Sequence, residues 1–454
     1  MKKTHYFLLA FCLLAAVGCN REEKFYYSSP NTIPNTNRQM QSPGFWIARN
    51  NCADKVILNP AGIVLFNSKT ENKLKLVKDL SKTVPVYAGS ELSSSLRKQI
   101  DGFLRRKLYS KNSIRTGEPF YREISRRINL EAIPRQINAR YGFVCCYVDQ
   151  RLLPTDDILT IEPGDSAFDE LQNSSLDIGT PVVILHETKD SGWVYAYSPV
   201  SSGWIKKDSV AFCGFDEFKS FLEKAPFVVT VSAKSDIFRD SELKQHIDYV
   251  RMGARFPLAD NFDSGTVSVF VPGQTKEGKL VERIAYMRKA DVNIGYLAYT
   301  PRNIMQQAFK LLNAPYSWGG KNGEQDCSGF VQEVFSTAGI ILPRNSAEQG
   351  QVGRLLGNFS EKTDNESKVR ILDKQAAGGA ALLRLKGHIL IYLGMYAGRP
   401  YVIHEIHAYR QRQGLGKDIV RKINRTVVSD LYLGEGSRKG SLLDRVVSIR
   451  NISG

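Results

Sequence analysis

The chemistry that this chain can perform centres on one cysteine between a turn-rich segment and a helix. Cys327 follows the stretch 315–320, PYSWGG, and the apolar residues after Ser328 recur at helical spacing as far as Gly339. The amino end of a helix carries unpaired amide groups and the positive end of its dipole, and both favour a thiolate. With Asp326 as the expected cap, we predict that Cys327 is a nucleophile held in its ionised form.

A cysteine nucleophile needs a base, and the base needs an orienting partner. Two apolar segments around a turn region predict a β-hairpin over residues 387–404. Centred near Tyr396, this hairpin would place His388 directly opposite His404, on one face and with Cβ atoms about 5 Å apart. The alternation of side chains along a strand puts Glu405 on the other face. This is the geometry that a base and its orienting partner require, so we expect His388 and His404 to form that pair.

These segments together resemble the NlpC-type bacterial cell-wall cysteine peptidases, which are compact papain-like α+β domains. The resemblance covers residues 300 to 410, and its motifs occur in the order that the family shows. They are PYSWGG, DCSGF, LPRNS at 342–346 with Gln349, and GHILIYLG followed by VIH.

Carried over residue by residue, the resemblance implies three catalytic roles. Cys327 is the nucleophile, His388 the general base and His404 the third polar residue. Tyr316 matches a tyrosine whose hydroxyl assists at the oxyanion site. The thiol chemistry needs no cofactor, and six scattered histidines do not have metal-ligand spacing.

The resemblance also implies a substrate, the peptide stems of peptidoglycan. We expect a cysteine endopeptidase that cleaves between D-glutamate and the following diamino acid. Asp326 and Ser328 flank the nucleophile where the family's substrate-binding residues lie. Two alternatives remain open: a papain-like wall amidase or acyltransferase, and a non-catalytic wall-binding lipoprotein.

The amino terminus predicts export and lipid anchoring. Two lysines precede an apolar run at 6–17, which is too short to span a bilayer but suits a signal segment. The run leads into Ala-Val-Gly-Cys, which resembles a bacterial lipobox. We expect a signal peptide over 1–18, a lipidated Cys19 on the periplasmic face of the outer membrane, and a flexible polar tether over 19–43.

Composition shifts along the rest of the chain predict a multidomain protein. Gly-Trp pairs and short alternating strands in 144–224 resemble the bacterial SH3-like barrels attached to such peptidases, and 225–299 carries fainter echoes. In related peptidases with this layout the first barrel lines the substrate pocket and selects stems with a free amino-terminal L-alanine. The expected units are a mixed, mainly helical domain at 44–143, two small all-β SH3-like barrels at 144–224 and 225–299, and an α+β papain-like peptidase domain at 300–454.

The chain has 454 residues and a formal net charge of +16. Such a charge suits attraction to anionic wall polymers or lipid head groups. It would also suit nucleic acid, but an exported protein does not meet that partner, so we expect no nucleic-acid binding. We expect the protein to be a monomer.

Overall fold

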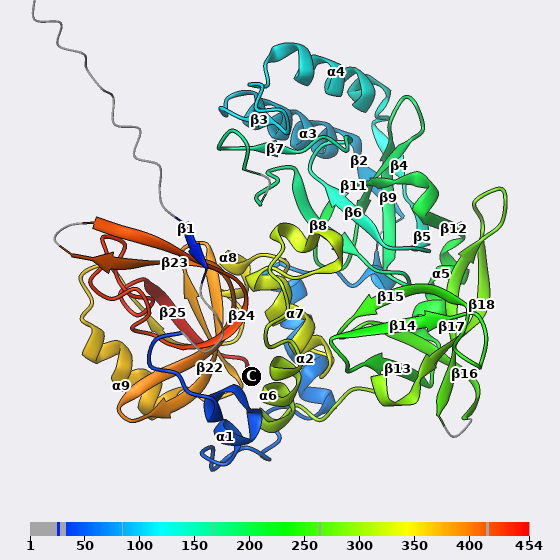
Figure 1. Ribbon diagram of the computed structural model, residues 1–454. Coiled ribbons are helices and arrows are strands. Elements are labelled where there is room, and N and C mark those ends of the chain that lie inside the picture. The colour runs from blue at the N-terminus through cyan, green and yellow to red at the C-terminus, as the bar shows by residue number, and fades with distance from the viewer. Residues whose placement is uncertain are drawn as a thin grey trace, which may run out of the picture.

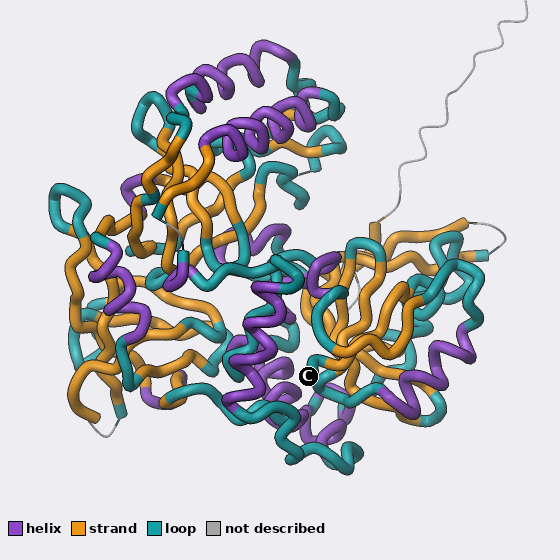
Figure 2. Tube along the Cα trace, turned by 180° about the vertical axis from the view of Figure 1, so that it is seen from behind, coloured by secondary structure: helices purple, strands orange, loops and turns teal. Residues whose placement is uncertain are grey.

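Three seven-stranded sheets form the framework of the computed structural model, which describes residues 25–27, 33–83, 85–165, 167–262, 265–414 and 417–453. Figure 1 shows two sheets one above the other on the right and the third on the left, with helices α6 (Pro301–Lys310) and α7 (Cys327–Ser336) between them. The view from behind shows the same central column of helices (Figure 2). The molecule is therefore multidomain, with a sheet-and-helix unit facing two β-rich units.

The sheet of the carboxy-terminal unit carries helices on both faces. Its strand order is β1 (Phe25–Tyr27), β24 (Lys417–Asp430), β23 (Arg399–Gln413), β22 (His388–Tyr396), β21 (Ala381–Leu385), β25 (Val446–Asn451) and β20 (Arg354–Asn358). Apolar residues alternate along β22, so Ile391 packs with the α7 side chains and Leu390 packs with Leu372 of α9 (Asn365–Gln375) on the opposite face. A short helix, α8 (Ser346–Gln349), lies between α7 and β20 in the chain. This two-sided burial holds α7 firmly against the sheet.

Helix α7 forms where the sequence predicts it. Its apolar face, which includes Phe330, Val331 and Val334, is fully buried. Asp326 caps its amino end, and Gly339 follows its carboxyl end with φ of +77°. Cys327 therefore occupies the first helical position.

Residues after 410 belong to this sheet, although they carry no motif that the resemblance covers. Strand β24 pairs with β23 along most of its length, and β25 lies between β21 and β20. The basic tail that the sequence leaves unassigned thus completes the peptidase sheet.

The first barrel is built from residues 140–213, and β10 is the middle strand of its sheet. Its strand order is β12 (Val210–Cys213), β5 (Arg140–Val144), β9 (Pro181–Glu187), β10 (Trp193–Tyr197), β11 (Ser202–Lys206), β6 (Val148–Arg151) and β8 (Gln172–Leu176). A helix, α5 (Phe215–Glu223), follows it in the chain.

The second barrel is built from residues 227–294. Its strand order is β15 (His246–Arg251), β14 (Lys234–Phe238), β18 (Leu280–Arg288), β17 (Thr266–Gln274), β16 (Arg255–Phe262), β13 (Phe227–Thr230) and β19 (Val292–Ile294). Its core is separate from that of the first barrel and is rich in valine.

The stretch expected to fold as one amino-terminal unit is divided between two cores. Helices α1 (Pro43–Ile47) and α2 (Pro60–Asn72) contribute side chains to the core that contains α6 and α7. Helices α3 (Gly89–Leu104) and α4 (Glu118–Ile128) share a core with the first barrel. Two-stranded pairs reinforce this part: β2 (Val86–Ala88) with β4 (Gln136–Asn138), and β3 (Tyr109–Ser110) with β7 (Leu159–Thr160).

The tether predicted for 19–43 is wrong for its second half. Ile33 and Met40 are 2% and 3% exposed, and the Asn35 carbonyl accepts a hydrogen bond from the Tyr401 hydroxyl at 2.7 Å. Apolar side chains placed among polar ones anchor this stretch to the peptidase sheet, and composition alone does not register that. The predicted signal peptide and Cys19 lie outside the described residues. Among the described residues, no helix combines the length and apolar character needed to cross a membrane.

Candidate active site

Cys327 lies at the amino end of α7 and opens onto a pocket. The residue is 8% exposed and contributes to the wall of a cavity of about 710 Å³. The backbone amide of Ile389 lies close enough to its sulfur to act against the rise in the pKa of the thiol. Because Ile389 follows His388 in β22, this contact brings the thiol to the start of the strand that carries the expected base.

The two expected histidines are in contact. His388 Nε2 lies 2.8 Å from His404 Nδ1, and His404 Nε2 lies 3.0 Å from the Ser429 hydroxyl oxygen. The predicted direct opposition of the two histidines is wrong, because the hairpin pairs Ile391 with Ile403 and turns after Tyr396 with a bulge on the way. The rings therefore meet diagonally, beyond the hydrogen-bonded part of the hairpin.

This chain of contacts fixes which nitrogen each ring offers. If His404 donates from Nε2 to the Ser429 oxygen, its Nδ1 is free to accept from His388 Nε2. His388 is then left with an unprotonated Nδ1, the form that a general base requires. Burial lowers the pKa of His388 to about 3, and burial with the neighbouring His388 lowers the pKa of His404 well below its usual value. Both rings are thus neutral at neutral pH.

The predicted thiolate is not supported by the surroundings of Cys327. Burial, followed by the nearby Asp326 carboxylate, raises the pKa of the thiol to about 12, and the Ile389 amide and Arg344 oppose this only in part. The helix terminus does not compensate, because Asp326 already accepts from the amides of Ser328 and Gly329 at 3.1 and 2.8 Å. The resting site therefore holds a neutral thiol.

Asp326 forms a buried ion pair with Arg344. The guanidinium donates from Nη1 and Nη2 to the two carboxylate oxygens at 3.0 and 2.8 Å. The Gly319 amide donates to the same carboxylate at 3.1 Å. Burial alone would raise the pKa of Asp326, but Arg344 and the amide donors outweigh it and lower the pKa. This carboxylate fixes the start of α7 and the loop before it.

The substrate-binding role that the resemblance implies for Asp326 and Ser328 stays a prediction. Both residues line the pocket. The acceptor capacity of Asp326 is nevertheless taken up within the protein, and the Ser328 hydroxyl donates to Asp326 and accepts from Arg344 Nη1 at 3.0 Å. Their contacts support a positioning role.

Tyr316 lies beside the nucleophile. Burial, then the neighbouring Cys327 and Asp326, raises the pKa of its hydroxyl. The phenol therefore keeps its proton at neutral pH and can donate a hydrogen bond into the pocket, whose wall it shares with Cys327. This placement agrees with an oxyanion donor.

Three parts of the chain build the pocket wall. The peptidase unit supplies Trp318, Ser346 and Glu348 in addition to the residues described above; the first barrel supplies Glu170, Gln172, Asn173 and Tyr195; and the amino-terminal stretch supplies Lys75, Lys78, Gln99 and Arg106. Arg106 and Glu170 form an ion pair across two of these parts. Within the described part of the chain, no three His, Cys, Asp or Glu side chains gather as a metal site.

Two residues of the site were not predicted from the sequence. Arg344 stands inside the LPRNS motif, so the motif could have identified it as the partner of a buried acid. Ser429 lies in β24, where no motif marks it, and only the pairing of β23 with β24 brings it to His404.

Comparisons with known proteins agree with this geometry. Residues 313–434 match the model of the NlpC/P60 family, and residues 161–206 match that of an SH3 domain of the SH3b1 type. The chain is 28% identical over 195 residues to the bifunctional muramidase/DL-endopeptidase CwlT of Bacillus subtilis, covering 41% of this chain and 54% of that relative. It is 34% identical over 71 residues to the gamma-D-glutamyl-L-lysine dipeptidyl-peptidase of the same species, covering 15% and 24%.

A solved structure shares the fold over most of the length. An NlpC/P60 endopeptidase from Photobacterium damselae subsp. piscicida covers 88% of this chain and 94% of its own, with a TM-score of 0.71 and 20% identity. The chain spans about half of the first curated relative and less of the second. The resemblance to NlpC-type peptidases and the predicted multidomain fold class are confirmed.

Proposed function

We propose that this chain, through its NlpC/P60 domain, is a peptidoglycan hydrolase that acts as a cysteine endopeptidase. The observation that carries the proposal is that Cys327 lines a pocket and lies next to the start of β22. This strand begins with His388, which contacts His404 of β23. An amidase or acyltransferase would use the same thiol and imidazole pair, so the products of the reaction must distinguish these alternatives from an endopeptidase.

The neutral resting state sets the order of the chemical steps. His388 accepts the thiol proton as the sulfur attacks the carbonyl carbon, so that the thiolate forms only in the course of attack. The Cys327 amide and the Tyr316 hydroxyl donate to the developing oxyanion. The amine leaves with the proton from His388, and a thioester remains. Water, deprotonated by His388, then releases the acid and restores the thiol.

We propose the bond between D-glutamate and the following diamino acid as the target. The similarity to the gamma-D-glutamyl-L-lysine dipeptidyl-peptidase of Bacillus subtilis supports this bond. Glu170 and Tyr195 of the first barrel line the pocket, and we infer that the barrel restricts it to a short peptide rather than a long glycan-linked stem. We therefore expect a preference for stems with a free amino-terminal L-alanine.

The test is incubation with L-alanyl-γ-D-glutamyl-diaminopimelate beside the same peptide acetylated at its amine. Release of L-Ala-D-Glu from the free peptide alone, detected by mass spectrometry, is the expected result, and Cys327→Ala supplies the blank. Cleavage of both peptides would contradict the free-amine preference. Release of the stem from a muramyl peptide, with the γ-glutamyl bond intact, would establish an amidase instead.

We also propose lipid anchoring through Cys19, which lies outside the described residues. The charged start, short apolar run and lipobox-like sequence support it. Cys19→Ser should move the protein from the membrane fraction to the soluble fraction of the cell envelope. An unchanged distribution would contradict the anchor.

A further inference from the structure

The loop that leads into the nucleophile has a backbone that few sequences adopt without support. Within the segment Trp318–Gly323, φ is positive at Gly319, Gly320, Asn322 and Gly323, with values from 58° to 74°. Such backbone persists when its surroundings hold it in place. Because this loop connects Tyr316 to Asp326 and Cys327, whatever holds it also positions the nucleophile.

The second barrel contacts this loop directly. Tyr249 of β15 donates its hydroxyl to the Asn322 carbonyl at 3.1 Å, and Lys234 of β14 donates to Glu324 at 2.6 Å. A Cβ atom on Gly323 would lie 2.1 Å from the Tyr249 hydroxyl, so the barrel and the loop fit closely. The second barrel is therefore part of the scaffold around the site.

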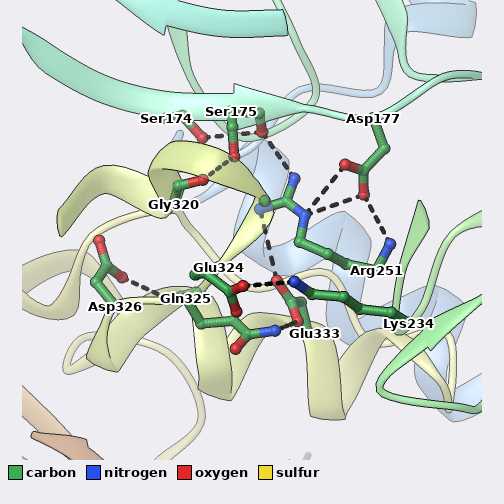
Figure 3. Close-up of polar contacts among 12 residues, drawn as sticks. Ser174, Ser175, Asp177, Lys234, Arg251, Gly320, Glu324, Gln325, Asp326 and Glu333 are labelled. Carbon is green, nitrogen blue, oxygen red and sulfur yellow. Dashed lines mark hydrogen bonds and ion pairs between the residues drawn. The ribbon is translucent and has the colours of Figure 1, made fainter. Parts of the chain in front are cut away.

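Arg251, the last residue of β15, joins three units (Figure 3). Its Nε donates to Asp177 of the first barrel at 3.1 Å, and its Nη2 donates to the Ser175 carbonyl at 3.0 Å. Its Nη1 lies 3.6 Å from Glu333 Oε1 on α7. The Arg251 and Asp177 side chains are each 12% exposed, which strengthens their interaction relative to a surface pair.

Two routes connect Arg251 to the nucleophile. On one, the Ser175 hydroxyl donates to the Gly320 carbonyl at 2.8 Å, so the strand end that Arg251 holds also holds the loop. On the other, Glu333 accepts from Gln325 Nε2 at 2.9 Å, and Gln325 immediately precedes Asp326. Figure 3 shows Arg251 between the first barrel above and the Glu333–Gln325 pair below.

We propose that Arg251 is a positioning residue for Cys327, and that the second barrel serves to set the nucleophile's geometry. The proposal rests on the proposed cysteine chemistry, since it names a further determinant of the same site. Arg251 does not line the Cys327 pocket, so it acts through the loop and α7. Asp177 is the nearer of the two carboxylate partners of Arg251, at 3.1 Å from its Nε, whereas Glu333 lies 3.6 Å from its Nη1.

The experiment compares Arg251→Lys and Arg251→Gln with the wild-type full chain. Lysine keeps the charge but lacks the planar fork, so it cannot keep both hydrogen bonds, to Asp177 and to Ser175, together with the ion pair to Glu333. Since a small misplacement of a reacting group costs up to about 100-fold in rate, kcat should fall by roughly 10- to 100-fold while KM stays within about threefold. Asp177→Asn should act in the same direction, and the double variant should be no worse than the poorer single variant.

Arg288→Lys is the matched control. Arg288 lies in β18 of the same barrel and pairs at 2.9 Å with Asp236, which belongs to that barrel too. Its replacement should leave kcat unchanged. Each variant is assayed at least 10 °C below its own melting temperature, so that a loss of folded protein does not imitate a loss of rate.

A second readout does not depend on the peptide chosen. The rate at which iodoacetamide alkylates Cys327 should change in the Arg251 variants and not in Arg288→Lys. If the peptide proves not to be a substrate but this difference appears, the positioning role stands and the proposed bond specificity fails. Wild-type kcat and wild-type alkylation in folded Arg251→Gln would overturn the positioning role.

Discussion

Alkylation of Cys327 is expected to follow the pH dependence of a neutral, buried thiol. Burial and the Asp326 charge together raise the pKa of the thiol to about 12, and their effect on this pKa outweighs that of the helix terminus. Only the thiolate reacts appreciably with iodoacetamide. The perturbation is therefore a pH series on the unmodified full chain, followed by the same series on Asp326→Asn.

The magnitude follows from the thiolate fraction. An ordinary cysteine has a pKa of about 8.5, so roughly 3% of it is ionised at pH 7. With a pKa of about 12, Cys327 is ionised about 3,000-fold less at the same pH. Its alkylation rate should rise about tenfold per pH unit from pH 6 to pH 9 without reaching a plateau.

The assay resolves each cysteine by mass spectrometry after quenching and digestion. Cys52 is free and exposed, and it serves as an internal reference in every sample. The rate of Cys327 should still climb above pH 9, because its pKa is raised to about 12. Comparison within one digest removes errors in reagent concentration and in time.

Asp326→Asn should accelerate the alkylation of Cys327 at a fixed pH. Asparagine preserves the helix cap, so the main change is the loss of a negative charge beside the thiol. A nearby charge moves a pKa by about one unit or more, so the rate should rise about tenfold. A Cys327 rate that is fast and independent of pH between 5 and 8 would reveal a thiolate–imidazolium pair and would refute the reasoning, as would slower alkylation in Asp326→Asn.

Three further predictions concern the same site. Cys327→Ala should abolish peptide hydrolysis and leave the melting temperature within a few degrees, because truncating one small side chain removes little packing; a residual rate above the blank would contradict the nucleophile. Ser429→Ala should lower kcat roughly tenfold with little change in KM, because His404 loses its 3.0 Å partner and His388 loses the fixed tautomer, and an unchanged kcat would show that Ser429 only fills space. His388 and His404 both have lowered pKa values in the folded state, so the stability they contribute is present above pH 6.5 and is lost as the pH falls toward about 3. Between pH 7 and pH 5, the melting temperature of the double variant with asparagine at both positions should therefore fall by less than that of the wild type. Calorimetry measures this difference.

The local parts of the site were predictable from sequence because they depend on short-range patterns. The apolar spacing after Cys327 and the glycine at 339 describe a helix without reference to the rest of the chain. The parity of a strand likewise places His388 and His404 on one face, although the bulge in the hairpin shifts their register. A bulge adds one residue to one strand, and no turn signal announces it.

The remainder depends on contacts between distant segments. The protonation state of Cys327 is set by burial that only the assembled pocket creates, so the helix dipole alone gave the wrong form. Ser429, Arg251 and the buried Ile33 are common residue types, and the sequence around each of them contains no motif that indicates its role. Their roles come from contacts with other segments of the chain: Ser429 meets His404 of the neighbouring strand, Arg251 meets Glu333 of α7, and Ile33 packs in the core of the carboxy-terminal unit.

The burial of the segment around Trp46 in the peptidase core has a consequence for how the protein forms. Trp46 and Ile452 are 1% and 0% exposed and belong to one hydrophobic cluster. Residues near the two ends of the described chain therefore pack into the same core. Each barrel uses contiguous residues and can assemble as soon as its own stretch is released. The carboxy-terminal unit can fold only after its last strand has been synthesised. Until then the aromatic side chains of α1 remain exposed to solvent. The carboxy-terminal unit that carries Cys327 is therefore expected to fold last, so a chain whose synthesis is incomplete does not contain an assembled candidate site.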